Sequence, residues 1–182
     1  MTFTIRELDR RDSKKWAEPL AELSAKLWAD TFIGISYYTP EIVKGYTDVA
    51  FTTATLECEL SDSNNIFQLV ECEQTIVGYA KMENRQPVAA IQSKNPLYLS
   101  RFYLDRSLHG SGLAKKLLDS VNGAAEARGF LSLWLSVLEL NVPAVKFYTK
   151  HGFTKVGEWE YPYTSHGKRY IDIDWLMVRQ IK

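Results

Sequence analysis

Residues 97–118 read LYLSRFYLDRSLHGSGLAKKLL and give the clearest indication of the architecture. An apolar, aromatic-rich run ends in a polar turn, and Gly110 and Gly112 then open an amphipathic helical pattern. The first N–H groups of a helix have no partner within it, and the helix dipole adds partial positive charge there. Glycines allow a bulky anion to approach the main chain because they carry no Cβ. This order of strand, glycine turn and helix start predicts a phosphate-binding site.

The glycine pair has other interpretations. A cap or a tight turn explains two glycines at a helix start without any ligand. A Walker P-loop requires Gly-x-x-x-x-Gly-Lys-Ser/Thr, and no such run occurs in the sequence. A dinucleotide-binding loop requires Gly-x-Gly-x-x-Gly, but Lys115 stands where its third glycine would be. No carboxylate occurs in the predicted next strand, residues 130–137, so both nucleotide motifs are disfavoured.

The composition limits the classes of protein that fit. A chain of 182 residues with 46% hydrophobic and 24% charged residues predicts a single folded domain covering residues 1–182. Its 22 basic and 22 acidic residues balance, so we expect no nucleic-acid or membrane partner. The opening residues lack an apolar signal core and no run of 18 apolar residues occurs, which favours a cytoplasmic protein. Three widely spaced histidines predict no metal site.

The apolar periodicity predicts an α/β fold with a mixed central sheet flanked by helices. The strand–helix–strand unit over residues 97–137 should be parallel. We expect about six to seven strands, at residues 2–7, 66–72, 75–82, 97–104, 130–137, 154–161 and 169–178, with a turn at His166-Gly167 before the last. The expected helices are at residues 13–31, 53–60, 112–128 and 143–150, with a further helix that starts at residue 40.

A second informative block is NVPAVKFYTKHGF, residues 141–153. A purely structural interpretation makes Asn141 a helix cap, Phe147 and Phe153 core residues, and Gly152 the helix end. Tyr148 follows Asn141 by seven residues, about two helical turns, so the two lie on one side of the helix. They are therefore predicted to face one ligand.

Together the two blocks resemble the GNAT superfamily of N-acetyltransferases. Its acyl-CoA motif is Gln/Arg-x-x-Gly-x-Gly/Ala, which in this sequence reads HGSGLA at residues 109–114. Its later signature, Asn-x-x-Ala-x-x-Phe-Tyr-x-Lys-x-Gly-Phe, is met throughout residues 141–153. The resemblance covers essentially the whole chain. Residues 30–32, 40–60 and 76–79 are in addition similar to the bacterial spermidine/spermine acetyltransferase (PaiA-like) branch.

The resemblance implies acetyl-CoA as cosubstrate and a fold in which the fourth and fifth strands splay apart. The backbone of Phe102, Tyr103 and Leu104 would pair with the pantetheine arm. Main-chain N–H groups would bind the pyrophosphate; they belong to His109, Gly110, Ser111, Gly112, Leu113 and Ala114. His109 replaces the usual Gln or Arg, which predicts weakened binding. Asn141 would bind pantetheine, and Tyr148 would be the catalytic acid that protonates the thiolate.

The resemblance further implies direct acetyl transfer to the primary amine of a small molecule, a polyamine being favoured. The alternatives are a non-catalytic acyl-CoA-binding module and a protein N-terminal or lysine acetyltransferase. Ser100 stands where the polyamine branch often has a glutamate that acts as base. Substitute carboxylates are Glu83, Glu158 and Glu160, each also explained as a solvated strand residue; proton loss through water is the favoured route.

Aromatic residues predict where the acceptor amine binds, because aromatic faces attract alkylammonium groups. They lie in residues 33–46 and in the terminal hairpin: Tyr37, Tyr38, Tyr46, Tyr161 and Tyr163. The same residues also fit a core or a dimer interface, so the oligomeric state stays open, with a homodimer as one alternative.

Overall fold

The structure is a computed structural model that describes residues 2–35, 37–73, 75–165 and 168–181. The expected turn at His166-Gly167 lies outside these residues. The strands are β1 Phe3–Glu7, β2 Asn65–Cys72, β3 Thr75–Glu83, β4 Pro96–Leu104, β5 Ser132–Leu138, β6 Thr154–Ser165 and β7 Lys168–Gln180. The helices are α1 Ser13–Phe32, α2 Pro40–Ala50, α3 Thr53–Ser61, α4 Leu113–Glu126 and α5 Val142–Lys150, with short 3-10 turns at Arg10–Asp12 and Arg106–Leu108.

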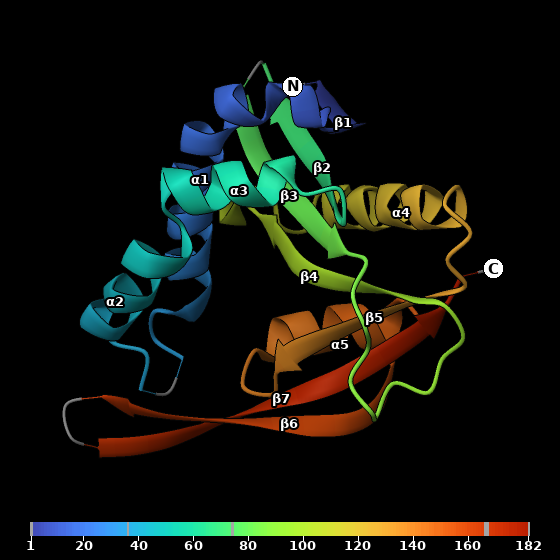
Figure 1. Ribbon diagram of the computed structural model, residues 1–182. Helices are drawn as coiled ribbons and strands as arrows, with labels where there is room; N and C mark the ends of the chain where they lie inside the picture. The colour runs from blue at the N-terminus through green and yellow to red at the C-terminus, as the bar shows by residue number, and fades with distance from the viewer. Residues whose placement is uncertain (1, 36, 74, 166–167, 182) are drawn as a thin grey trace. The chain divides into compact units, whose positions relative to one another are not determined.

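The strands form one mixed sheet in the order β1-β2-β3-β4-β5-β7-β6 (Figure 1). The β4–β5 pair is parallel, as predicted for a strand–helix–strand unit. The β1–β2, β2–β3, β5–β7 and β6–β7 pairs are antiparallel. The register of β4 on β5 runs from Pro96 opposite Ser132 to Tyr98 opposite Trp134, and β4 then continues to Leu104. The predicted α/β class and strand number are confirmed.

The chain divides into two compact units. The first comprises residues 1–84 and 99–124, and the second comprises residues 85–98 and 125–182. Each is described by itself below.

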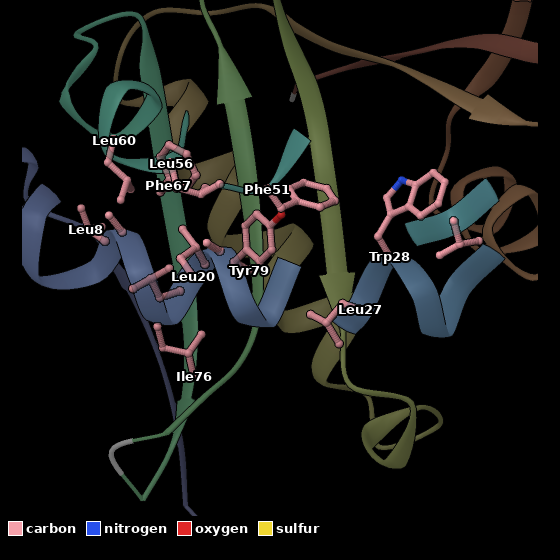
Figure 2. Close-up of a cluster of buried hydrophobic side chains, with 14 residues drawn as sticks. Leu8, Leu20, Leu27, Trp28, Phe51, Leu56, Leu60, Phe67, Ile76 and Tyr79 are labelled. Atoms are coloured by element: carbon pink, nitrogen blue, oxygen red, sulfur yellow. The ribbon is translucent and has the colours of Figure 1, made fainter. Parts of the chain in front are cut away.

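Helices cover both faces of the strands in the first unit. Leu20, Leu27 and Trp28 project from α1 into a buried cluster that also contains Phe67 of β2 and Tyr79 of β3 (Figure 2). Side chains alternate between the two faces of a strand, so Gln68 points the other way. There it accepts a hydrogen bond of 3.0 Å from Ser120 Oγ on α4. This packing fixes α4, and hence the glycine turn before it, on the sheet.

The helices start within one residue of the expected positions, α4 at Leu113 and α5 at Val142. Thr39 caps α2 and is followed by Pro40, and Thr52 caps α3. Asp12 stands at the N-cap of α1 without making a side-chain cap, because Asp9 caps the preceding 3-10 turn instead. Pro19 lies inside α1 without ending it; its side is exposed, so water can satisfy the carbonyl that loses its N–H partner.

The second unit contains a long β6–β7 hairpin, which Figure 1 shows as two strands side by side. Both strands exceed the predicted 154–161 and 169–178, and β6 continues through Pro162. Proline is tolerated because β6 is an edge strand. On the outer side of an edge strand no neighbouring strand accepts a hydrogen bond, so a missing N–H there costs none. On one face Trp134, Leu176 and Val178 form a small core with Ile91. On the other face, Arg179 lies over the Phe153 ring. Phe153 follows Tyr148 of α5 by 5 residues.

Candidate functional site

The end of β4 lies unusually close to β3 in the first unit. A Cβ on Gly78 would lie 2.7 Å from the Tyr103 carbonyl oxygen and 2.8 Å from Leu104 Cδ1. Contacts below 3.0 Å are not tolerated, so glycine is required for this close approach. Phe102 and Tyr103 are half-buried and Leu104 is buried, and Tyr103 packs on the ring of Tyr79. The predicted pantetheine-pairing segment is therefore held firmly against β3.

The glycine turn has the backbone conformation that its sequence predicts. Gly110 and Gly112 have φ values of 80° and 81°, in the left-handed region that favours glycine. A Cβ on either would meet nothing within 4 Å. Backbone conformation, and not packing, is thus what selects glycine at both positions, and the main chain there is accessible to a ligand.

Some amides of this turn are already hydrogen-bonded within it. The His109 N–H donates to the Arg106 carbonyl at 3.1 Å, and the Ser111 N–H donates to the Leu108 carbonyl at 3.3 Å. The Leu113 N–H donates to Ser111 Oγ at 3.3 Å. The prediction treated all six positions of residues 109–114 alike, whereas the structure separates these three amides from those of Gly110, Gly112 and Ala114.

Side chains fix the turn to its surroundings. His109 Nε2 lies 3.2 Å from the Leu104 carbonyl oxygen, so the imidazole joins the turn to the end of β4. Asp105 caps the 3-10 turn through the Ser107 N–H and accepts a 2.8 Å bond from Lys26 of α1. The Lys26 hydrogen bond is the largest cause that lowers the pKa of Asp105 from 3.8 to about 2.

In the second unit, α5 holds both later predicted residues. Asn141 caps the helix, its Oδ1 accepting from the Ala144 N–H at 3.3 Å, so the structural interpretation of this residue is confirmed. Tyr148 is buried, 8% exposed, with its ring near those of Phe147 and Phe153, each at 5.4 Å. Burial raises the pKa of the Tyr148 phenol above its ordinary value, and the Tyr98 phenol adds to the rise. Tyr148 therefore remains protonated, as an acid must.

A polar cluster that was not expected from the sequence surrounds Ser136 of β5. The Tyr98 hydroxyl lies 3.5 Å from Ser136 Oγ, and Ser136 also hydrogen-bonds Tyr161 of β6 and Asp174 of β7. Burial raises the pKa of Asp174 from 3.8 to about 6; the Ser136 hydrogen bond opposes this rise, and Asp172 adds to it. Burial is also the largest cause that raises the pKa of Tyr161.

A signal for this cluster exists in the sequence. Asp172 and Asp174 share the alternation of Leu176 and Val178, which are buried. Burying the charge of a carboxylate is costly, so a carboxylate on the apolar face of a strand indicates a specific role.

Ser100 and two of the three carboxylates considered as a base in its place have other contacts. Ser100 Oγ donates to the Lys81 carbonyl at 3.2 Å. Glu83 lies 3.0 Å from Lys81 Nζ, and Glu158 lies 2.5 Å from Lys155 Nζ. Glu160 is exposed on β6.

A second cluster that the sequence did not reveal lies in the first unit. Glu59 of α3 pairs with both guanidinium nitrogens of Arg101, at 2.5 and 2.9 Å, and with Lys81 Nζ at 3.1 Å. The Arg101 guanidinium lies 5.0 Å from the centre of the Phe51 ring. Burial lowers the pKa of Arg101, but Tyr79 and Glu59 more than offset this and the net shift is upward. The cluster ties α3 to β3 and β4.

The aromatic residues divide between core and surface. Tyr38 packs on Trp28 and Phe32. Tyr46 stacks on Trp28 at 4.3 Å yet is 48% exposed. Tyr37 stacks on Tyr38, Tyr161 stacks on Trp159 and is 39% exposed, and the side chain of Tyr163 lies outside the described residues.

The predicted residues thus fall into two sets. The structure brings the β4 end together with the turn at residues 109–114 in the first unit, and Asn141 with Tyr148 in the second. Within the described residues, no three His, Cys, Asp or Glu side chains gather as they would around a metal ion. No helix among the described ranges has the length and apolarity needed to span a bilayer.

Comparison with known proteins identifies similar acetyltransferases. A family model described as the acetyltransferase (GNAT) family matches residues 25–153. The chain is similar to an uncharacterized N-acetyltransferase of Mycobacterium tuberculosis, with 28% identity over 142 residues that cover 78% of this chain and 84% of the relative. It is also similar to the spermine/spermidine N(1)-acetyltransferase of Bacillus subtilis, with 33% identity over 91 residues, 49% of this chain and 59% of that one.

Solved structures share the fold. The PaiA N-acetyltransferase of Thermoplasma acidophilum, in complex with coenzyme A, has a TM-score of 0.76 and 22% identity, over 99% of each chain. An acetyltransferase of the GNAT family from Streptococcus pneumoniae has a TM-score of 0.69 and 26% identity, over 99% of this chain and 100% of that one.

Proposed function

The chain belongs to the acetyltransferase (GNAT) family, and from that premise we propose that it moves the acetyl group of acetyl-CoA directly to the primary amine of a small molecule. The observation that carries the proposal is the glycine turn: two left-handed glycines stand between a strand and a helix start, at the positions of the family's acyl-CoA motif. We further propose that residues 1–182 work as one N-acetyltransferase domain.

The first unit would hold the nucleotide end of acetyl-CoA. The amides of Gly110, Gly112 and Ala114 are proposed to bind the pyrophosphate, aided by the dipole of α4. The backbone of Phe102, Tyr103 and Leu104 would pair with the pantetheine arm as an added strand does. Gly78 supports this role because it lets the segment lie close against β3.

The residues of α5 are proposed to act on the thioester end of acetyl-CoA. Tyr148 would give its proton to the sulfur as the C–S bond breaks; its burial and raised pKa suit a group that must stay protonated until then. Asn141 would hydrogen-bond pantetheine through its amide N–H, since its Oδ1 caps α5.

A polyamine is the proposed acceptor. The Bacillus subtilis relative named for spermine and spermidine supports this choice over about half the chain. So does Tyr46, whose exposed ring is held by stacking on Trp28 and can take a cation on its outer face.

The test is a turnover screen with acetyl-CoA and separate panels of polyamines, monoamines, aminoglycosides, amino acids and peptides, with mass detection of products. We expect acetylated polyamine and stoichiometric free coenzyme A. Acetylated peptide alone would favour a protein acetyltransferase. Thermal stabilisation by acetyl-CoA without product from any panel would favour a non-catalytic acyl-CoA-binding module.

A further inference from the structure

We infer that Asp174 is the base that removes the proton from the acceptor ammonium, with Ser136 as its positioning residue. The inference rests on the proposed function. An alkylammonium with a pKa near 10.4 is neutral in only about one molecule in 10³ at pH 7, so a group on the protein has reason to take its proton. The sequence offered no convincing residue for that step.

Strand register places the necessary groups on one face of the second unit. Asp174 lies opposite Leu138 of β5 and opposite Trp159 of β6. Since side chains alternate along a strand and directly paired residues share a face, Ser136 and Tyr161 lie on the face of Asp174. Their hydrogen bonds at Ser136 and the nearby Tyr98 hydroxyl confirm that four strands converge there.

The cluster is electrostatically joined to the proposed acid. Tyr98 acts on the phenols of both Tyr148 and Tyr161, so it links the proposed acid to the cluster that contains Asp174. Asp174 and Ser136 are half-buried.

The surroundings of Asp174 suit proton transfer better than those of the other carboxylates. Glu59, Glu83 and Glu158 are all in contact with a lysine or arginine. Asp174 instead has Ser136 and the like charge of Asp172 as its neighbours, and its pKa of about 6 lies close to working pH, where a general base is most effective.

A cation lies beside the cluster. Arg85 lies over the Tyr98 ring at 4.4 Å and acts on Tyr161, and Tyr161 itself faces Asp174.

The step balances as follows. Asp174 takes one proton from the ammonium and passes it to solvent, and the freed nitrogen lone pair forms the C–N bond at the thioester carbonyl. The C–S bond then breaks, and the sulfur takes the Tyr148 proton. The second proton lost by the nitrogen restores the Tyr148 phenol, so the products are amide, thiol and one released proton.

The test compares pH profiles of kcat/KM for wild type and D174N with two acceptors, a simple alkylamine and the weakly basic 2,2,2-trifluoroethylamine. With the alkylamine, wild type should rise through the Asp174 pKa of about 6 and then level, because it uses the abundant ammonium form. D174N should instead keep rising toward the pKa of the amine and lose about 10²–10³-fold at pH 7. With trifluoroethylamine, which is already neutral at pH 7, the loss should be no more than about fivefold.

Two further variants keep the test independent of how well D174N folds. The Ser136 hydrogen bond lowers the Asp174 pKa and Asp172 raises it, so S136A should shift the acid limb to higher pH and D172N to lower pH. An acid limb that none of the three variants moves would overturn the inference, and so would equal losses on both amines in D174N. Failure of wild type to acetylate any amine would instead overturn the proposed function, and this inference with it.

Discussion

Each unit contains a carboxylate cluster shielded from water, and the two are built in opposite ways. In the first unit Glu59 and Glu83 meet Lys81 and Arg101, so each charge lies against an opposite one. In the second, Asp174 meets the hydroxyl of Ser136 and the like charge of Asp172. Burial raises the pKa of Asp174 to about 6; the Ser136 hydrogen bond opposes this rise, and Asp172 adds to it.

The difference separates two uses of a shielded charge. A paired carboxylate stays ionised and holds elements together, and removing one partner leaves the other uncompensated. A carboxylate whose pKa is raised by burial and by a like charge exchanges its proton near neutral pH. The first arrangement predicts an effect on folding, and the second predicts an effect on turnover.

The largest expected effect is on turnover. Y148F keeps the packed ring but removes the proposed acid, so kcat should fall about 10²–10⁴-fold with little change in melting temperature. Y170F, which removes a hydroxyl from a half-buried tyrosine of β7 with no proposed role, is the control and should change kcat less than about threefold. A loss of a few-fold in Y148F would remove Tyr148 from the acid role.

The next effect is on folding. E59Q leaves Arg101 and Lys81 short of negative charge and should destabilise the protein by about 3 kcal/mol, measured by urea unfolding. D48N breaks the exposed Lys44–Asp48 pair on α2 and should cost less than about 0.5 kcal/mol. Equal effects of the two variants would show that pairing in the first unit contributes nothing beyond a surface ion pair.

A smaller effect links folding of the first unit to cosubstrate binding. G78A forces a Cβ against the Tyr103 carbonyl and should destabilise by about 1–3 kcal/mol while raising the KM for acetyl-CoA. G123A is the matched control: its Cβ meets nothing within 4 Å, and an exposed glycine inside α4 gains about 1 kcal/mol on change to alanine. Unaltered acetyl-CoA kinetics in G78A would argue against strand pairing with pantetheine.

The smallest effects have opposite signs in the two units. The folded-state pKa of Asp105 is lowered to about 2, so its contribution to stability is present above about pH 4 and is lost as pH falls toward 2. D105N should therefore lose about 1 kcal/mol at neutral pH, and the loss should vanish in acid.

The folded-state pKa of Asp174 is raised from 3.8 to about 6, so the carboxyl favours the fold below pH 4 and loses that contribution as pH rises through 6. D174N should therefore gain about 1 kcal/mol above pH 6. Thermal melts of both variants between pH 2.5 and 8 check the pair; stability curves that move in the same direction would contradict it.

The architecture could be predicted because its signals are local. Thr39 and Pro40 mark a helix start within two residues, and the glycine turn is explained by backbone conformation at Gly110 and Gly112. The hairpin was predicted too short because Pro162 normally ends a strand; its edge position, a property of the whole sheet, removes that penalty.

The polar clusters could not be predicted in the same way because they depend on register. Ser136 and Asp174 are 38 positions apart and meet through the antiparallel β5–β7 pairing. Glu59 and Arg101 are 42 positions apart and meet where α3 packs near β4. Spacing within a motif therefore predicted Tyr148 and Asn141 as candidate site residues. Side chains that are brought together by strand pairing or helix packing could be identified only from the structure.

The proline in β6 has a consequence for how molecules of this protein meet one another. The outer side of an edge strand offers its amides and carbonyls to any extended chain in solution, which is how sheets grow into aggregates. Pro162 removes one of those donors midway along the hairpin, and Glu158 and Glu160 add charge beside it. Pro162 and the two glutamates therefore disfavour the pairing of another chain with the β6 edge of the sheet.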